Sequence, residues 1–299
     1  MGGETRRTSI NGLKMAQTLL QRLTSFLPRR FRRGVPFVPV VRLTGVIGYT
    51  TPLSPGMTLA SVAKTLDRAF AMKKAKAVAL VINSPGGSAA QSHLIHLRIR
   101  SLADEHKRKV IAVVEDVAAS GGYMIASAAD EIVADPSSIV GSIGGVSAGF
   151  GFDKLIKRFG IERRVYTAGE RKMLLDPFEP EKAEDVKRLK SAQRAIHEQF
   201  IALVKERRGK KLRGPEKNLF SGEFWTAGEA EKLGLIDGLG DLRGTLRERF
   251  GKKVVLRLIP PATGWFGRRS PGVSEAPGDW AASLITAIET RAIWARFGL

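Results

Sequence analysis

The chain has 299 residues, 43% of them hydrophobic, which is enough to bury a sizeable core in one large domain or two modest ones. It contains no cysteine, and this excludes structural disulfides, thiol nucleophiles and thiolate metal sites. Lysine and arginine outnumber aspartate and glutamate by 49 to 29, so the net charge of +20 favours anionic partners such as nucleic acid or a membrane surface.

The first 34 residues predict a basic amphipathic extension. From residue 8 to 27, leucine and isoleucine recur at spacings of three and four with basic residues between them, and the stretch PRRFRR follows. Such a helix can bind an anionic membrane surface through residues 8–33, or pack on its own domain or on a neighbouring subunit. Because no window offers about 18 apolar residues and no signal-peptide core is seen, we expect a protein that is cytoplasmic or peripherally associated with a membrane.

Residues 35–258 predict one domain of repeated βαβ units. Apolar, β-branched runs typical of buried strands alternate with segments of helical period. The predicted strands are 36–48, 77–84 and 110–116, and the predicted helices are 57–75 and 88–109. This alternation predicts an α/β fold with a parallel sheet, in which functional sites gather at the carboxyl ends of the strands.

The second half of the domain predicts shorter elements around one long helix. Residues 182–208 have a charged face and an apolar face at helical spacing. The other predicted elements are short strands or turns at 131–135, 138–145 and 163–170, a helix within 224–242 that Gly234 ends, and a strand at 252–260. Beyond the domain, residues 259–278 are rich in proline and glycine and predict a linker, and residues 279–299 predict an amphipathic C-terminal helix.

Ser120 stands where a strand should turn into a helix, directly before two glycines. A serine in this position can be an exposed nucleophile, and the N–H of Gly121 at the start of the helix can stabilise an oxyanion. A second N–H donor should come from a neighbouring strand end, where Gly86 and Gly87 let the backbone approach a substrate carbonyl. A purely structural Ser-Gly-Gly turn is the alternative.

A nucleophilic serine needs a base, and the sequence leaves two possibilities. The four histidines lie in predicted helices or a hinge, away from turns and strand ends, which disfavours a Ser-His-Asp triad without excluding it. A neutral lysine is the other recurrent base, and it requires burial that lowers the pKa of the amine from about 10.4 toward about 7 or 8. Lys172 precedes three apolar residues that could bury it; a solvated lysine is the alternative.

A metal site is not expected. His93 and His96 could share a helix face, but no further ligand completes a metal site.

Four segments occur in an order that resembles a known family. They are INSPGG (82–87), AASGGYMIASAADEIVADPSSIVGSIG (118–144), AGERK (168–172) and FWTAGEAEKLGLIDGLGD (224–241). Over about residues 36–245 the chain resembles peptidase family S49, the signal peptide peptidase A family within the ClpP/crotonase superfamily. The resemblance implies that Ser120 and Lys172 form a serine-lysine dyad, that Gly121 and Gly87, or less favourably Gly86, are the oxyanion donors, and that Ser142 orients the lysine amine.

The resemblance also implies a fold and a function. We expect a ClpP/crotonase-like serine endopeptidase that hydrolyses hydrophobic peptides such as cleaved signal peptides, without metal or nucleotide cofactor, in a homo-oligomeric ring or dome. Two other functions remain open: a crotonase-fold enzyme acting on acyl-CoA, which would not need Lys172, and a non-catalytic membrane-associated scaffold. Nucleic-acid binding is not expected, because the positive charge is spread widely and aromatic residues make up only 7% of the chain.

Overall fold

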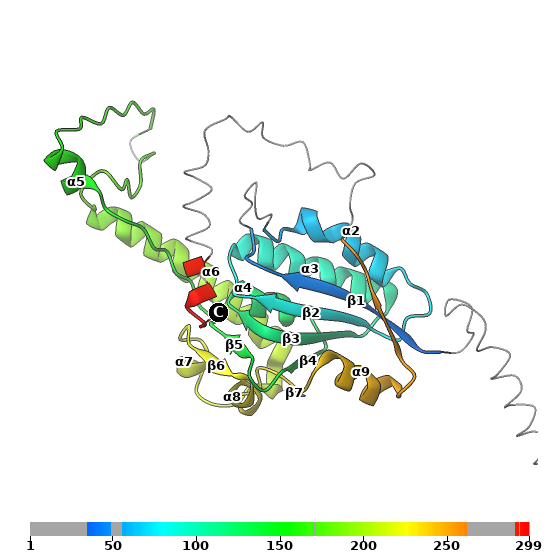
Figure 1. Ribbon diagram of the computed structural model, residues 1–299. Helices are drawn as coiled ribbons and strands as arrows, with labels where there is room; N and C mark the ends of the chain where they lie inside the picture. The colour runs from blue at the N-terminus through cyan, green and yellow to red at the C-terminus, as the bar shows by residue number, and fades with distance from the viewer. Residues whose placement is uncertain (1–34, 49–55, 170–171, 262–290, 293, 299) are drawn as a thin grey trace, which may run out of the picture.

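The computed structural model describes residues 35–48, 56–169, 172–261, 291, 292 and 294–298 (Figure 1). The helix predicted within residues 8–33 and most of the linker predicted at 259–278 lie outside the described residues. Within the described part of the chain, no helix combines the length and the apolar character needed to cross a membrane.

A sheet of eight strands forms the centre of the molecule. Six strands lie in the order β6-β5-β3-β2-β1-β8, while β4 pairs with β3 and β7 pairs with β4. Every pair is parallel except β5 with β6. The strands are β1 (Phe37–Thr44), β2 (Val78–Ser84), β3 (Val110–Ala119), β4 (Glu131–Ala134), β5 (Ile139–Gly141), β6 (Phe224–Thr226), β7 (Gly238–Leu239) and β8 (Val255–Leu258).

The long strand β3 belongs to two ladders on one side. Residues 111–114 pair with β4, whereas residues 117–119 pair with β5. On the other side, the register with β2 shifts between Ile82 and Ser84. The carboxyl end of β3, which Ser120 follows, therefore has different neighbours from the beginning of the strand.

Helices cover both faces of the sheet (Figure 1). Val41 and Leu43 of β1 belong to the main core with helices α2 (Leu59–Phe70), α3 (Ala89–His106) and α4 (Gly121–Ala126). Val38 and Val40 alternate with them and pack toward Leu246 of α9 (Leu242–Phe250) on the opposite face. Because both faces are covered, residues 78–82 of β2 and 110–114 of β3 are all apolar and buried, as the sequence indicated.

The long helix α6 (Ala183–Arg208) carries an arm that points away from the sheet (Figure 1). We call residues 145–182 the arm; it includes α5 (Asp153–Arg158), which has no buried residue. Several large apolar side chains of the arm are exposed, and Tyr166, Phe150 and Phe159 are 91%, 80% and 70% exposed. After α6 the chain continues through η2 (Gly209–Lys211), α7 (Glu216–Leu219) and α8 (Ala227–Lys232).

The predicted α/β fold with a parallel sheet is confirmed, and each strand and helix predicted up to residue 116 corresponds to an observed element. The long helix predicted at 182–208 is also present, but its apolar face is buried only near its end. Phe200 and Val204 lie in the core, whereas Ile196 is 47% exposed. The helix α9 was not predicted, because its sequence LRGTLRERF is dominated by arginine and buries only Thr245 and Leu246.

Candidate active site at the carboxyl ends of β2, β3 and β5

Ser120 occupies a strained turn between β3 and α4. Its φ of 52° and ψ of −120° lie in a region that residues other than glycine rarely adopt. The N–H of Ser120 donates to the carbonyl of Gly141 at 2.7 Å, and its carbonyl accepts from the N–H of Met124 at 3.0 Å. The residue is partly exposed. The turn therefore presents a hydroxyl at the carboxyl end of β3 in the manner of a nucleophile elbow.

Glycines pack against this elbow where a larger residue would not fit. A Cβ on Gly86, whose φ is 104°, would lie 2.8 Å from the Cβ of Ser120. A Cβ on Gly121 would lie 2.2 Å from the Oγ of Ser92, and one on Gly122 would lie 2.4 Å from a backbone carbonyl oxygen of β2. The close approach of β2, α3 and α4 explains why glycines stand at 86, 121 and 122, whereas a Cβ on Gly87 would lie 2.1 Å from the carbonyl oxygen of Ile47. Sequence reasoning did not single out Ser92, whose small side chain lies fully buried against the second pair.

Two backbone N–H groups beside Ser120 have no acceptor among the described residues. The N–H of Gly121 is the first of α4, so it has no partner within the helix. The N–H of Gly87 makes no hydrogen bond to a described residue either. Gly86 differs, because its N–H donates to the Oγ of Ser84 at 3.3 Å. Both free N–H groups could therefore receive an oxyanion, and the hydrogen bonding favours Gly87 over Gly86.

Ser142 lies next to the elbow, immediately after Gly141 at the end of β5. It is 9% exposed and has a φ of 53°. On the following residue, the carbonyl of Ile143 accepts a hydrogen bond from Nε2–H of His197 at 3.0 Å, so α6 fixes the segment that contains Ser142. Sequence reasoning gave His197 no role because it lies in the middle of a helix; only the packing of α6 shows the contact.

Lys172 lies in the arm, between α5 and α6, and is exposed. Its backbone N–H donates to the carbonyl of Gly169 at 3.2 Å, and no hydrogen bond joins its Nζ to Ser120. Met173 and Leu174, which the sequence suggested could bury the lysine, are themselves 36% and 37% exposed. The structure thus brings together Ser120, both glycine pairs and Ser142, but a single chain neither buries Lys172 nor joins it to the serine.

The buried histidine near the site supports α4. His96 is 4% exposed, and its Nδ1–H donates to the carbonyl of Met124 at 2.8 Å. Burial lowers the pKa of His96 from 6.5 to about 4, so the ring is neutral at pH 7. Across the described residues, no group of three or more histidine, aspartate or glutamate side chains could hold a metal ion.

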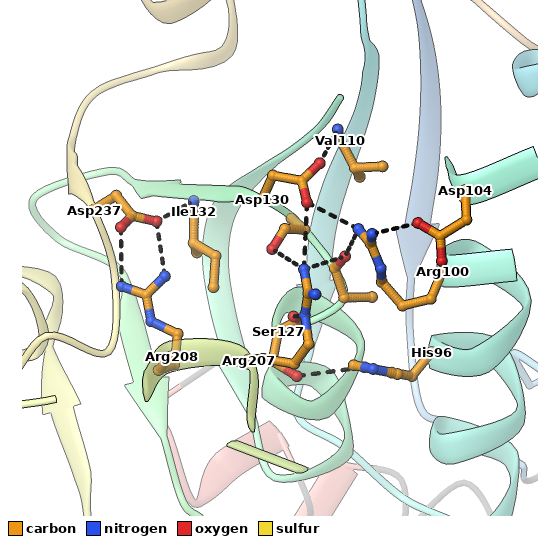
Figure 2. A network of polar contacts seen from close by, with 12 residues as sticks. His96, Arg100, Asp104, Val110, Ser127, Asp130, Ile132, Arg207, Arg208 and Asp237 are labelled. Carbon is orange, nitrogen blue, oxygen red and sulfur yellow. Dashed lines mark hydrogen bonds and ion pairs between the residues drawn. The ribbon is translucent and has the colours of Figure 1, made fainter. Parts of the chain in front are cut away.

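A polar network fastens the end of α6 to the rest of the domain (Figure 2). Arg208, 3% exposed, pairs with Asp237 at 2.8 Å, and Arg207 pairs with Asp130 at 3.4 Å. Burial alone would raise the pKa of Asp237, but hydrogen bonds from Arg208 and Lys211 outweigh it and hold that pKa below 3.8. The last part of α6 is therefore firmly held, while its beginning extends into the arm.

Two family models match the chain. One describes peptidase family S49 and matches residues 103–253, and the other describes a ClpP-like SDH-type serine proteinase and matches residues 12–152. The first match covers just over half of the chain and includes Ser120, Ser142 and Lys172. The chain belongs to peptidase family S49. The resemblance drawn from the four motifs is confirmed, and the family is one of serine-type peptidases.

Two relatives show how much longer the matching proteins are than this S49 family chain. This chain is 58% identical over 291 residues to a Na(+)/H(+) antiporter NhaA of Brucella abortus (strain 2308). The match covers 94% of this chain and 39% of that protein. The chain is 39% identical over 176 residues to the chloroplastic serine protease SPPA of Arabidopsis thaliana, a match that covers 57% of this chain and 25% of that protein. The chain thus spans less than half the length of either relative.

One solved structure aligned with this S49 family chain is that of the 1510-N membrane-bound stomatin-specific protease in complex with a substrate peptide. The TM-score is 0.49 at 18% sequence identity, and the alignment covers 85% of this chain and 99% of the other.

Proposed function

We propose that this chain is a serine endopeptidase in which Ser120 is the nucleophile and Lys172 the general base. Gly121 and Gly87 donate to the oxyanion, and Ser142 orients the lysine amine. The observation that carries the proposal is the elbow: a partly exposed serine held at a φ of 52° beside two N–H groups that have no acceptor in the described part of the chain. Strain of this kind gathers at functional sites, and an ordinary Ser-Gly-Gly turn would not need it.

The proposed reaction is acyl transfer to Ser120. The neutral amine of Lys172 takes the proton of the hydroxyl as Oγ attacks the carbonyl carbon of the peptide bond, and the negative charge moves to the carbonyl oxygen. The N–H groups of Gly121 and Gly87 stabilise that charge. Lys172 then protonates the leaving amine as the C–N bond breaks. In deacylation it takes a proton from water, which attacks the ester carbon, and returns the proton to Oγ.

The exposed position of Lys172 supports an assembled form of the enzyme. A lysine works as a base only when desolvation favours its neutral form, and the arm of one chain leaves Lys172 in water. The same arm exposes Phe150, Phe159 and Tyr166, and exposed apolar groups gathered on one element mark an interaction surface. We infer that arms pack in a homo-oligomeric ring or dome, and that this packing buries Lys172 and brings it to a Ser120.

Hydrophobic peptides, such as cleaved signal peptides, are the substrates that we propose. The resemblance to the family implies this substrate class, and an enclosing assembly would restrict access to short or unfolded chains. Residues 8–33, which lie outside the described residues, carry the basic amphipathic pattern that suits an anionic membrane surface. Binding there would bring the enzyme to the place where hydrophobic peptides accumulate.

A fluorophosphonate probe tests the nucleophile directly. Wild type should be labelled at Ser120, and Ser120→Ala should not be labelled. Lys172→Met should lower peptide cleavage by about 1,000-fold or more, the size of effect seen when a member of a catalytic pair is lost. Ser137→Ala and Lys64→Met are matched controls, because both residues are exposed and lie outside the arm and the proposed machinery; both variants should behave as wild type.

The pH dependence of peptide cleavage and the activity on acyl-CoA thioesters distinguish the peptidase from the crotonase-type enzyme and the non-catalytic scaffold. Wild-type cleavage should decline as pH falls, because a protonated Lys172 cannot accept the proton of Ser120. Full activity of Lys172→Met on an acyl-CoA thioester would instead favour the crotonase-type enzyme. A wild type that neither reacts with the probe nor cleaves peptides at any pH, although assembled, would favour the non-catalytic scaffold.

A further inference from the structure

The last described residues of the chain pack on the sheet behind the nucleophile elbow. Phe297, 7% exposed, forms a buried cluster with Val117 and Ala119 of β3, and Trp294 lies at the border of this cluster. The Phe297 ring also meets the ring of Phe224 edge-on, with the ring centres 5.4 Å apart. The C-terminal segment therefore contacts both β3 and β6.

These aromatic side chains cover the outer face of the short ladder that leads to Ser120. The three residue pairs of that ladder are Val117↔Ile139, Ala118↔Val140 and Ala119↔Gly141. Ala118 and Val140 belong to the main core on the side of the helices. The side chains that alternate with them belong to the separate cluster, where Phe297 and Trp294 pack against them.

The pairing of β2 with β3 ends close to the elbow. Beyond the register shift, Ser84 and Ala118 are the last residues that β2 and β3 pair. A backbone with the φ of Ser120 persists only where its surroundings hold it in place. The three-residue ladder and the side chains on its two faces supply part of that restraint, together with the close packing around Gly86, Gly121 and Gly122.

We propose that Trp294 and Phe297 are positioning residues, whose packing on β3 and β5 keeps the Ser120 hydroxyl in its reactive geometry. The inference rests on the proposed function of Ser120. Phe297 acts by two routes. It packs on Ala119, the residue before the nucleophile, and it packs on Phe224, which pairs with the Gly141 that accepts the N–H of Ser120.

The test is the rate at which a fluorophosphonate probe labels Ser120 in the full chain. Phe297→Ala and Trp294→Ala should each lower the second-order rate by about 10- to 100-fold, because small displacements at a reacting centre have effects of that size. Phe297→Leu keeps much of the apolar contact and should recover most of the rate. Arg296→Ala is the matched control, because Arg296 is exposed in the same segment and should leave the rate unchanged.

The final extent of labelling separates positioning from loss of folded protein. A displaced nucleophile reacts slowly but to completion, whereas a partly unfolded population reacts at the normal rate but incompletely. Thermal unfolding should show that each variant is folded at the assay temperature.

Three results would overturn the inference. Equal rates in wild type, Phe297→Ala and Trp294→Ala, or a lower extent at an unchanged rate, would remove the positioning role and leave the proposed function of Ser120 intact. A wild type that the probe does not label would remove both.

Discussion

The N–H of Ser120 donates to the carbonyl of Gly141 at 2.7 Å, and this hydrogen bond continues the β3–β5 ladder by one step beyond the last residue of β3. The chain turns at that point into α4 with a positive φ. The hydroxyl is thus fixed at the end of two parallel strands, where open α/β sheets place their functional groups. The strength of this restraint can be tested by changing the residues that surround it.

Gly86 tests the packing around the elbow. Gly86→Ala places a Cβ 2.8 Å from the Cβ of Ser120, at a backbone φ of 104° that disfavours any L-residue. We expect a loss of stability of about 1–3 kcal/mol and at least about 100-fold slower probe labelling. Urea unfolding and labelling rates measure the two effects.

Gly228→Ala is the control for this substitution, because a Cβ there meets no atom within 4 Å. Gly228 lies in α8, so alanine should stabilise the chain by about 0.5–1 kcal/mol without changing the labelling rate. Gly86→Ala with wild-type labelling would mean that the elbow tolerates displacement.

The exposed apolar side chains of the arm test the proposed assembly. A Phe159→Ser, Tyr166→Ser double variant should leave the free energy of unfolding of the single chain within about 0.5 kcal/mol of wild type. It should reduce both the assembled mass in analytical ultracentrifugation and the peptide cleavage, because the two side chains are 70% and 91% exposed in one chain.

Leu97→Ser provides the comparison, because Leu97 is 49% exposed on α3, away from the arm. It should assemble and cleave as wild type does. A double arm variant with the wild-type mass distribution and activity would contradict an interface made by the arm.

Asp237 tests the buried network at the end of α6. Asp237→Asn leaves the guanidinium of Arg208, which is 3% exposed, without its counter-charge, so we expect a loss of about 3 kcal/mol at pH 7. The folded-state pKa of Asp237 lies below 3.8, so the stabilisation is present above that pH and is lost as pH falls through the folded value. The difference between variant and wild type in urea unfolding should therefore shrink below about pH 4.

The exposed pair of Glu179 with Lys182 is the control for this prediction. Glu179→Gln should change stability by less than about 0.5 kcal/mol, as is usual for surface ion pairs. If both substitutions lowered the free energy of unfolding equally, burial would not make the Arg208–Asp237 pair more important for stability than a surface pair.

The lowered pKa of the buried His96 ring predicts how the stability of the fold depends on pH between neutrality and pH 4. Burial lowers the pKa of His96 from 6.5 to about 4, so the unfolded chain binds more protons in that interval. Stability should fall as pH falls from about 6.5 and level off below about 4, with a total contribution of about 3 kcal/mol. His96→Asn keeps a donor for the Met124 carbonyl but cannot ionise, so its unfolding should lack this part of the pH dependence. His106→Asn, on the partly exposed end of α3, should retain it.

The fold and the elbow could be predicted from the sequence because their signals are local. Continuous apolar runs predict buried parallel strands, and a serine before two glycines at a strand end predicts a sharp turn into a helix. The resemblance already favoured Gly87 over Gly86 as an oxyanion donor, and the hydrogen bond from the Gly86 N–H to Ser84, which no spacing reveals, supports the same preference.

The environment of Lys172 could not be predicted in the same way. Three apolar residues follow it in the sequence, but whether they bury an amine depends on what the arm packs against. The arm extends away from the sheet (Figure 1), and within one chain Lys172 is exposed, as are Met173 and Leu174 beside it. The packing of Phe297 on β3 is likewise invisible locally, because it joins segments far apart in the chain. The domain boundaries at 34/35 and 258/259 stay predictions.

The pairing of β1 with both β2 and β8 has a consequence during synthesis. The outer edge of β1 stays open until Val255–Leu258 have left the ribosome, and ribosomes add only about 5–20 residues per second. An unpaired edge is a template on which a strand of another chain can add. The nascent polypeptide therefore passes through a vulnerable interval whose duration is set by translation speed, and slower decoding ahead of β8 should increase its demand for chaperones.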